Sequence, residues 1–140
     1  TAKDDPVEEQ IIFGFTQRAI SNINNLDGTY VGLSFNASNA AGEQINPVKL
    51  VCSSGTCTGA RYTDIETGAT TAGTSLVFGT PDYIGATAST GMVQATVGGT
   101  GSAICAIDLN AGGTGQIIGS CAGEDPADTS KLFNVLFTKL

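Results

Sequence analysis

The spacing of the cysteines around turn sequences is the feature that most constrains how this chain can fold. Cys52 and Cys57 are separated by Ser-Ser-Gly-Thr, which suits a two-residue turn at Ser54 and Gly55. In a hairpin with that turn, the two cysteines lie opposite each other at a non-hydrogen-bonded pair, where Cα atoms approach to about 4.5 Å. A disulfide spans such a distance. The spacing therefore predicts a hairpin closed by a bridge between Cys52 and Cys57.

The other two cysteines have a similar symmetry. Cys105 and Cys121 are equidistant from Gly113, the centre of a glycine-rich segment between two alternating apolar runs. A hairpin folded about Gly113 places Cys105 opposite Cys121. The alternatives are the two other connectivities and four reduced thiols, but an even number of cysteines without C-x-x-C spacing favours disulfides. Two local bridges indicate an oxidising, extracytoplasmic location: the periplasm, the cell surface or the exterior.

Short apolar runs with a two-residue period continue from Thr29 to the end of the chain, separated by clusters of Gly, Asn, Ser, Pro and Asp. In the first run, Val31, Leu33 and Phe35 lie on one face. Short connections favour antiparallel neighbours, because a parallel crossover needs more chain. The sequence predicts a mainly β fold, an antiparallel meander of about eight strands that forms a small barrel or a sandwich. The strand candidates are 29–36, 47–52, 57–65, 74–79, 91–97, 102–109, 115–121 and 132–138, with 83–88 as strand or loop.

The first quarter of the chain has a helical pattern instead. Asp5-Pro6-Val7-Glu8 combines an N-cap carboxylate, a Pro at the first helical position and a Glu at the third. Apolar residues then recur every four positions, which predicts one amphipathic α-helix over 6–24 with this stripe: Val7, Ile11, Phe15, Ala19 and Ile23. We expect the stripe either to pack on the strands or to be an interface, as the lower end of a longer assembly or membrane helix. The chain is expected to be one domain over 1–140, with this helix and an antiparallel β domain over 29–138.

Charge and composition exclude several classes of function. Six Lys and Arg against 13 Asp and Glu give a net charge of −7, so no nucleic-acid partner is expected, because that affinity depends on clustered cations. No apolar run reaches the roughly 18 residues of a membrane span. The absence of His excludes Ser-His-Asp and Cys-His catalytic sites and His-based metal sites. Cys121 lies in Gly-Ser-Cys-Ala-Gly, which is similar to a nucleophile elbow, but it has no base. We expect no catalytic residue, no cofactor and no enzymatic activity.

Two acidic clusters are the remaining candidates for a metal site. They are Asp4, Asp5, Glu8 and Glu9 near the start, and Glu124, Asp125 and Asp128 near the end. Neither has the regular spacing of a calcium loop, which must supply six to eight oxygen ligands. Helix capping and solubility are the expected roles, and no metal site is predicted.

Two loose resemblances to known families point to different functions. Leu26-Asp-Gly-Thr-Tyr-Val-Gly-Leu33 is similar to the first strand of lipocalin and avidin-like barrels, which would imply an up-and-down barrel, although the Trp usual in those families is absent. The layout of helix 6–24, an antiparallel sheet and a disulfide-closed segment from Cys105 to Cys121 resembles bacterial type IV pilins. The hydrophobic N-terminal stretch of a pilin is absent, and Cys52 with Cys57 is an extra pair.

These observations predict a non-enzymatic extracytoplasmic β-domain with a structural or binding role, which acts by contact with a protein or a surface. One alternative is a subunit of a type IV pilin-like filament, with helix 6–24 as a truncated stem. Another is a small-ligand carrier with a barrel lumen. A protein partner or self-association is expected, with the helical stripe as the candidate interface.

Overall fold

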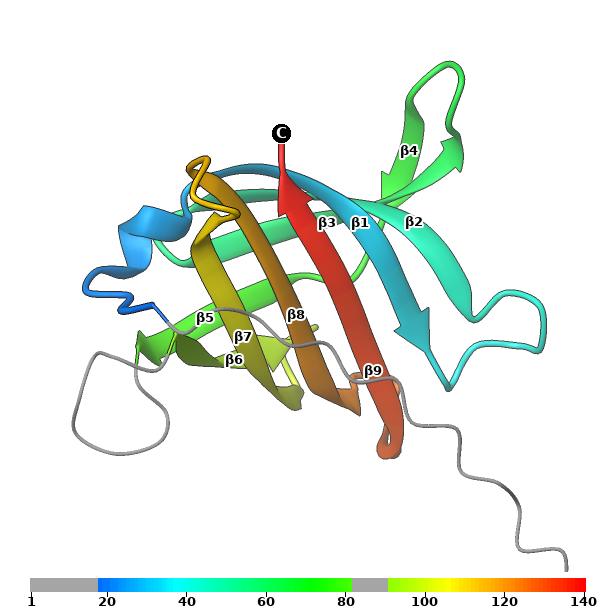
Figure 1. The fold of residues 1–140 in the computed structure, drawn as a ribbon. Helices are drawn as coiled ribbons and strands as arrows, with labels where there is room; N and C mark the ends of the chain where they lie inside the picture. Colours follow the sequence, from blue (N-terminus) through cyan, green and yellow to red (C-terminus); the bar gives the residue numbers. More distant parts are fainter. Residues whose placement is uncertain (1–17, 82–90) are drawn as a thin grey trace, which may run out of the picture.

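The fold is a β-barrel, seen in a computed structural model that describes residues 18–81 and 91–140 (Figure 1). Within these ranges the elements are a 3-10 turn, η1 (Ile23–Leu26), and the strands β1 (Gly28–Asn36), β2 (Ile45–Ser53), β3 (Thr56–Asp64), β4 (Ala69–Ala72), β5 (Leu76–Pro81), β6 (Met92–Val97), β7 (Gly101–Ala111), β8 (Gln116–Asp125) and β9 (Asp128–Lys139). No helix in the described part of the chain is long and apolar enough to cross a membrane.

All strand pairs are antiparallel, and the sheet closes on itself. The ring runs β1-β2-β3-β5-β6-β7-β8-β9 and returns from β9 to β1, which is the order of an up-and-down barrel. The predicted antiparallel meander is confirmed, and of the two predicted architectures the chain forms the barrel. β4 was not predicted, because its four residues, Ala-Thr-Thr-Ala, are all exposed and carry no apolar alternation. The candidate 83–88 lies outside the described residues.

β4 and β5 act as one strand that is interrupted by a bulge. Both pair with the same edge of β3: Ala72 lies opposite Ala60, and Leu76 lies opposite Cys57. Residues 73–75 therefore stand opposite only residues 58–59, which gives the β4–β5 side one extra residue. A β-bulge bends its strand. The hairpin of β3 and β4 consequently projects beyond the barrel, whereas β5 stays in its wall (Figure 1).

The inward-facing side chains fill the barrel with apolar residues. The core comprises Ile20, Leu26, Tyr30, Val48, Leu50, Cys52, Cys57, Leu76, Phe78, Val93, Ala95, Val97, Ala103, Cys105, Ile107, Ile117, Cys121, Phe133, Val135 and Phe137. β1 departs from its apolar pattern, because Tyr30, Ser34 and Asn36 are its buried positions. The face with Val31, Leu33 and Phe35 is the outer one, and Leu33 is 53% exposed there.

Both predicted disulfides are present, and both lie inside the barrel. Cys52 is bonded to Cys57 and Cys105 to Cys121, each pair directly opposite in its ladder with a Cα–Cα distance of 3.9 Å. Cys57, Cys105 and Cys121 have no exposed surface. The symmetry of the sequence about each turn therefore identified the correct connectivity.

The described part of the predicted helix is not α-helical. Residues 18–22 have no regular structure, and residues 23–26 form only the 3-10 turn. Asn22 caps this turn, since its Oδ1 accepts a hydrogen bond from the Asn24 backbone N–H at 2.9 Å. Ser and Asn side chains compete for backbone hydrogen bonds in this way, which disfavours a continuous helix. For residues 18–24 the prediction is wrong, and Val7, Ile11 and Phe15 of the predicted stripe lie outside the described residues.

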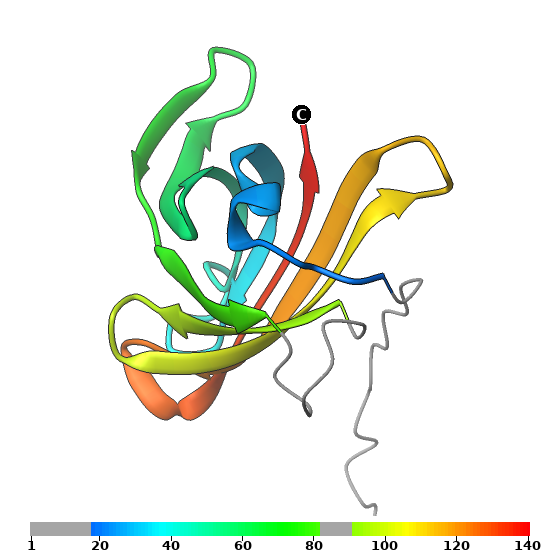
Figure 2. The ribbon, with the colours of Figure 1, turned by 90° about the vertical axis from the view of Figure 1, so that its left-hand side faces the viewer.

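Residues 18–26 instead close one end of the barrel, called here the capped end. Ile20, Ile23 and Leu26 recur every three residues and pack on the core, whereas Ala19 of the predicted stripe is exposed. η1 lies across the barrel end in Figure 2. The Arg18 Nε lies 2.8 Å from Oδ1 of the buried Asp108. This ion pair and the apolar residues attach the segment to the barrel.

The two disulfides are expected to stabilise the barrel unequally. In the chain-entropy model the bridge that closes the longer loop contributes more, about 3 kcal/mol for Cys105 to Cys121 against about 2 kcal/mol for Cys52 to Cys57. The double variant Cys105→Ala/Cys121→Ala should therefore unfold at lower urea concentration than Cys52→Ala/Cys57→Ala. Equal midpoints, or the reverse order, would contradict this ranking.

Tyr30 is expected to make the stability of the barrel fall at alkaline pH. Its hydroxyl donates a 2.7 Å hydrogen bond to the Leu26 carbonyl, and burial, with the nearby Asp27 charge, raises the pKa of Tyr30 to about 12. Because the pKa is higher in the folded than in the unfolded state, this contribution to stability is fully present below pH 10 and is lost as the pH rises towards 12. Urea unfolding from pH 9 to 12 should show this fall, and Tyr30→Phe should flatten it. An equal fall in both proteins would contradict the assignment.

Candidate functional site

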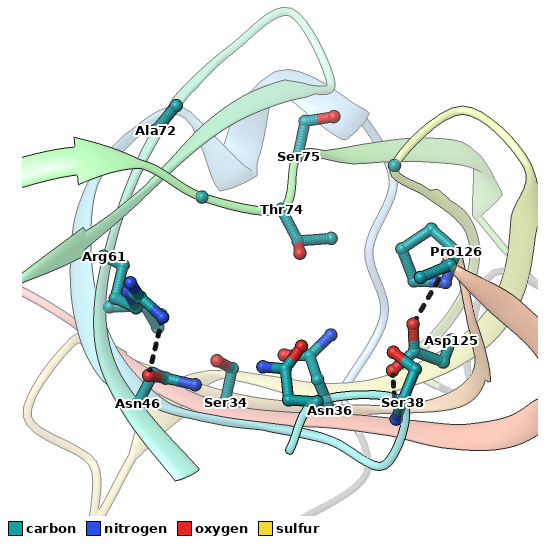
Figure 3. A pocket seen from close by; sticks show the side chains of 15 residues that line it. Ser34, Asn36, Ser38, Asn46, Arg61, Ala72, Thr74, Ser75, Asp125 and Pro126 are labelled. Carbon is teal, nitrogen blue, oxygen red and sulfur yellow. Dashed lines mark hydrogen bonds between the residues drawn. The ribbon is translucent and has the colours of Figure 1, made fainter. Parts of the chain in front are cut away.

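The end of the barrel opposite the cap opens into a polar cavity with a volume of about 640 Å³. We call this end the mouth; its rim consists of residues 37–44, 73–75, 98–100 and 125–127. The cavity is lined by Ser34, Asn36, Ser38, Asn39, Asn46, Val48, Arg61, Ala72, Gly73, Thr74, Ser75, Gly98, Asp125, Pro126 and Ala127 (Figure 3). Below it the barrel is packed, and the space beside Leu50, Leu76 and Phe133 is only about 10 Å³. A ligand would therefore be held at the mouth and not in the depth of the barrel.

The cavity is largely polar because the inward-facing side chains of β1, β2 and β3 are apolar in the depth of the barrel and polar at the mouth. In β1 the series ends with Ser34 and Asn36, and in β2 it ends with Asn46. In β3 the alternation that buries Cys57 and Gly59 brings Arg61 to the same side. Alternate residues of a strand share one face, so apolar residues in depth and polar residues at the end give a cavity with a hydrogen-bonding wall.

Hydrogen bonds between neighbouring loops hold the rim. The Gly98 N–H donates to the Ser75 carbonyl at 2.9 Å, and the Thr100 hydroxyl donates to the Pro126 carbonyl at 3.1 Å. The Ala37 N–H donates to the Leu132 carbonyl at 2.9 Å. Residues 73–75, 98–100 and 125–127 are thus tied to one another, and the connection after β1 is tied to strand β9.

Asp125 organises one side of the rim and is only 1% exposed. Its Oδ1 accepts from the Ala127 N–H at 2.9 Å, and its Oδ2 accepts from the Ser38 N–H at 3.3 Å. Burial raises the pKa of Asp125, but these hydrogen bonds and one from Asn36 outweigh burial, so the net shift is downward. The expected role in solubility is wrong for this residue, because the turn at 125–128 folds its carboxylate inward.

Arg61 lies across the cavity from Asp125 (Figure 3). Its Nη1 donates to the Asn46 Oδ1 at 3.4 Å, a long contact. The salt bridges among the described residues join Arg18 to Asp108 and Lys131 to Asp128, so they leave Arg61 without a carboxylate. The guanidinium has five N–H donors. Most of them remain available to a bound molecule.

The bulge at residues 73–75 completes the upper wall of the cavity in Figure 3 and directs Thr74 into it. A Cβ built on Gly59 would lie 1.8 Å from the Thr74 carbonyl oxygen, so only glycine permits this approach. The Gly73 N–H also donates to the Gly59 carbonyl at 3.0 Å. Gly59 therefore determines where the bulge, and with it Thr74, can lie.

The arrangement offers hydrogen bonds and one positive charge. No group of three or more His, Cys, Asp or Glu in the described ranges could hold a metal ion. The polar lining residues supply amides, hydroxyls, one guanidinium and one carboxylate that is already hydrogen-bonded, beside small apolar residues such as Val48 and Pro126. Such a wall suits recognition of a polar molecule.

The sequence named one residue of this cavity, Asp125, but only as a rejected candidate for a metal site. The cysteines form the disulfides in the core, Ala19 is exposed, and Ile23 packs at the capped end, whereas the rest of the predicted stripe lies outside the described residues. One signal could have indicated part of the cavity. Arg61 is an even number of positions from Cys57, so strand alternation places its charge on the inward face with that cysteine.

Comparisons with protein-family models, with curated proteins and with solved structures gave no match. The chemistry of the cavity therefore carries the functional argument.

Gly59→Ala should disrupt the mouth, because the added methyl group collides with the Thr74 carbonyl. We expect a loss of about 1–3 kcal/mol in the free energy of unfolding, as for other overpacked sites, with amide shift changes at residues 73–75. Gly79→Ala is the matched control, since its Cβ would come no closer than 3.3 Å to another residue. Equal effects of the two variants would show that the close approach is not needed.

Proposed function

We propose that the protein is a non-enzymatic, extracytoplasmic binding protein that takes a small polar ligand at the mouth of its barrel. The observation that carries this proposal is the polar cavity of about 640 Å³ at the end of a packed barrel. Ligand pockets commonly measure about 300–1,000 Å³ and occur in the mouths of β-barrels. The ligand-carrier alternative from the sequence thus becomes the leading hypothesis, with the site moved from the lumen to the rim.

The hydrogen-bonded rim supports a binding role. Ordering loops around a ligand costs free energy, and a site that is already ordered avoids most of this cost. The bonds from Gly98 to Ser75 and from Ser38 to Asp125 connect segments that are distant in the sequence. A ligand would meet a cavity whose walls are already in place.

The two internal disulfides support the extracytoplasmic part of the proposal. Disulfides persist in oxidising compartments and are rare in reducing ones. Both bridges lie in the barrel interior, where reductants have little access.

A ligand screen by NMR tests the proposal. Isotope-labelled protein is titrated with mixtures of neutral sugars, polyols, sugar acids and amino acids. We expect at least one compound to shift amides of residues 34–39, 46–48, 59–61 and 72–75. Thr74→Trp, which fills the cavity, should abolish these shifts, whereas Thr70→Trp on the exposed strand β4 should leave them unchanged.

Two results would contradict the proposal: no compound shifts these amides, or Thr74→Trp binds as well as the unmodified protein. Near-UV circular dichroism of each variant checks that the barrel remains folded.

A second candidate function is contact with a protein through the outer face of β1, β2 and β9. Leu33 is 53% exposed there and stands between Pro47 and Leu136 on the neighbouring strands. Ile45, 66% exposed, extends this apolar surface beside Phe35. Exposed apolar patches often mark protein contacts. In the same NMR samples, concentration-dependent shifts on this face that Leu33→Ser abolishes would favour this candidate.

The pilin-like alternative depends on an α-helix over residues 6–24. The part of this range that the structure describes, residues 18–24, forms no α-helix and so provides no such stem.

A further inference from the structure

We infer that the ligand of the mouth cavity is a sugar acid, whose carboxylate pairs with Arg61 and whose hydroxyl groups bind the surrounding amides and hydroxyls. This inference rests on the proposed function and names the class of ligand for it.

The position of Arg61 is the first argument. It is partly buried in the cavity wall, and its side chain reaches the cavity without a carboxylate to pair with among the described residues. Its neighbour on β2 is the uncharged Asn46, and Val48 lies directly opposite in the ladder. Arg18 and Lys131 each pair with a carboxylate of the protein, Asp108 and Asp128, whereas Arg61 pairs with none among the described residues.

The geometry of the guanidinium indicates a carboxylate. Its planar fork can donate two parallel hydrogen bonds to one carboxylate, the strongest neutralisation available to it. In a protein with a net charge of −7, long-range electrostatics favour cationic ligands. An arginine placed in the cavity therefore provides local attraction for an anion where the rest of the molecule repels one.

The opposite wall limits where this negative charge can sit. The buried Asp125 carboxylate would repel a second anion beside it. A ligand with a single carboxylate on an otherwise neutral molecule can pair with Arg61 while it keeps this charge away from Asp125 on the opposite side of the cavity (Figure 3).

The remaining lining residues suit a hydroxyl-rich body. Ser34 and Thr74 direct hydroxyl groups into the cavity, and Asn36 and Asn46 contribute amides (Figure 3). Hydroxyls and amides each donate and accept, which matches the hydroxyl groups of a sugar. The apolar lining residues are small, with Val48 and Pro126 as the largest, so the lining offers no deep apolar pocket for a long alkyl chain.

The test compares D-glucuronate with D-glucose, which lacks the carboxylate, by calorimetry and NMR. We expect D-glucuronate to bind more tightly, by about tenfold or more, because only its carboxylate can accept charged hydrogen bonds from Arg61. Arg61→Gln should remove this preference, so that D-glucuronate binds no more tightly than D-glucose. The control is Lys49→Gln, which changes the net charge equally on the outer face of β2 and should preserve the preference.

Three outcomes would overturn the inference. If glucose binds at the mouth as tightly as glucuronate, the charge is not recognised, although the proposed function stands. If only neutral or cationic compounds of the screen shift the cavity amides, the inference is again wrong and the proposed function again stands. If glucuronate binding survives Arg61→Gln but is lost in Lys49→Gln, the anion binds outside the cavity. Amide spectra of both variants verify that the barrel is intact.

Discussion

The one-residue excess of the β4–β5 side over β3 is the constraint on which the shape of the molecule depends. Residues 73–75 stand opposite residues 58–59, and Gly59 has no side chain to keep Thr74 away. Without the extra residue, β4 and β5 would continue as one straight strand. With it, β4 and the second half of β3 project from the barrel, while β5 pairs with β6 and completes the wall. The bulge thereby directs Thr74 into the barrel mouth and gives the cavity one of its walls.

The two ends of the barrel are closed by different physical means. At the capped end, Ile20 and Leu26 cover the core with apolar surface, and the Arg18–Asp108 ion pair anchors the segment. At the mouth, backbone hydrogen bonds join the loops, and Asp125 links two of them. Apolar closure excludes water, whereas a polar rim keeps a wet cavity open. This difference leaves the mouth, and not the capped end, open to solvent.

Much of the fold could be predicted from local patterns, but little of the site could. Disulfide pairing followed from the symmetry of each cysteine pair about its turn, and antiparallel order followed from the short connections. The inward face of β1 could not be read from hydrophobicity. Leu33 is more apolar than Ser34, yet Ser34 faces the cavity and Leu33 the outside. The ligand hypothesis depends on Arg61 and Asn46, on neighbouring strands, facing Asp125 across the cavity, and Asp125 comes from a distant part of the chain.

The sequence by itself determined the hairpins, the two disulfides and the antiparallel meander, because each depends on residues close together in the chain. Only the tertiary structure decided that the sheet closes through β1 and β9 and that residues 18–26 cap it without an α-helix. Helix propensity of a few tenths of a kcal/mol per residue is small beside the burial of Ile20 and Leu26 against a preformed barrel end. The cavity also belongs to the tertiary level, since it exists only where four connections meet around polar strand ends.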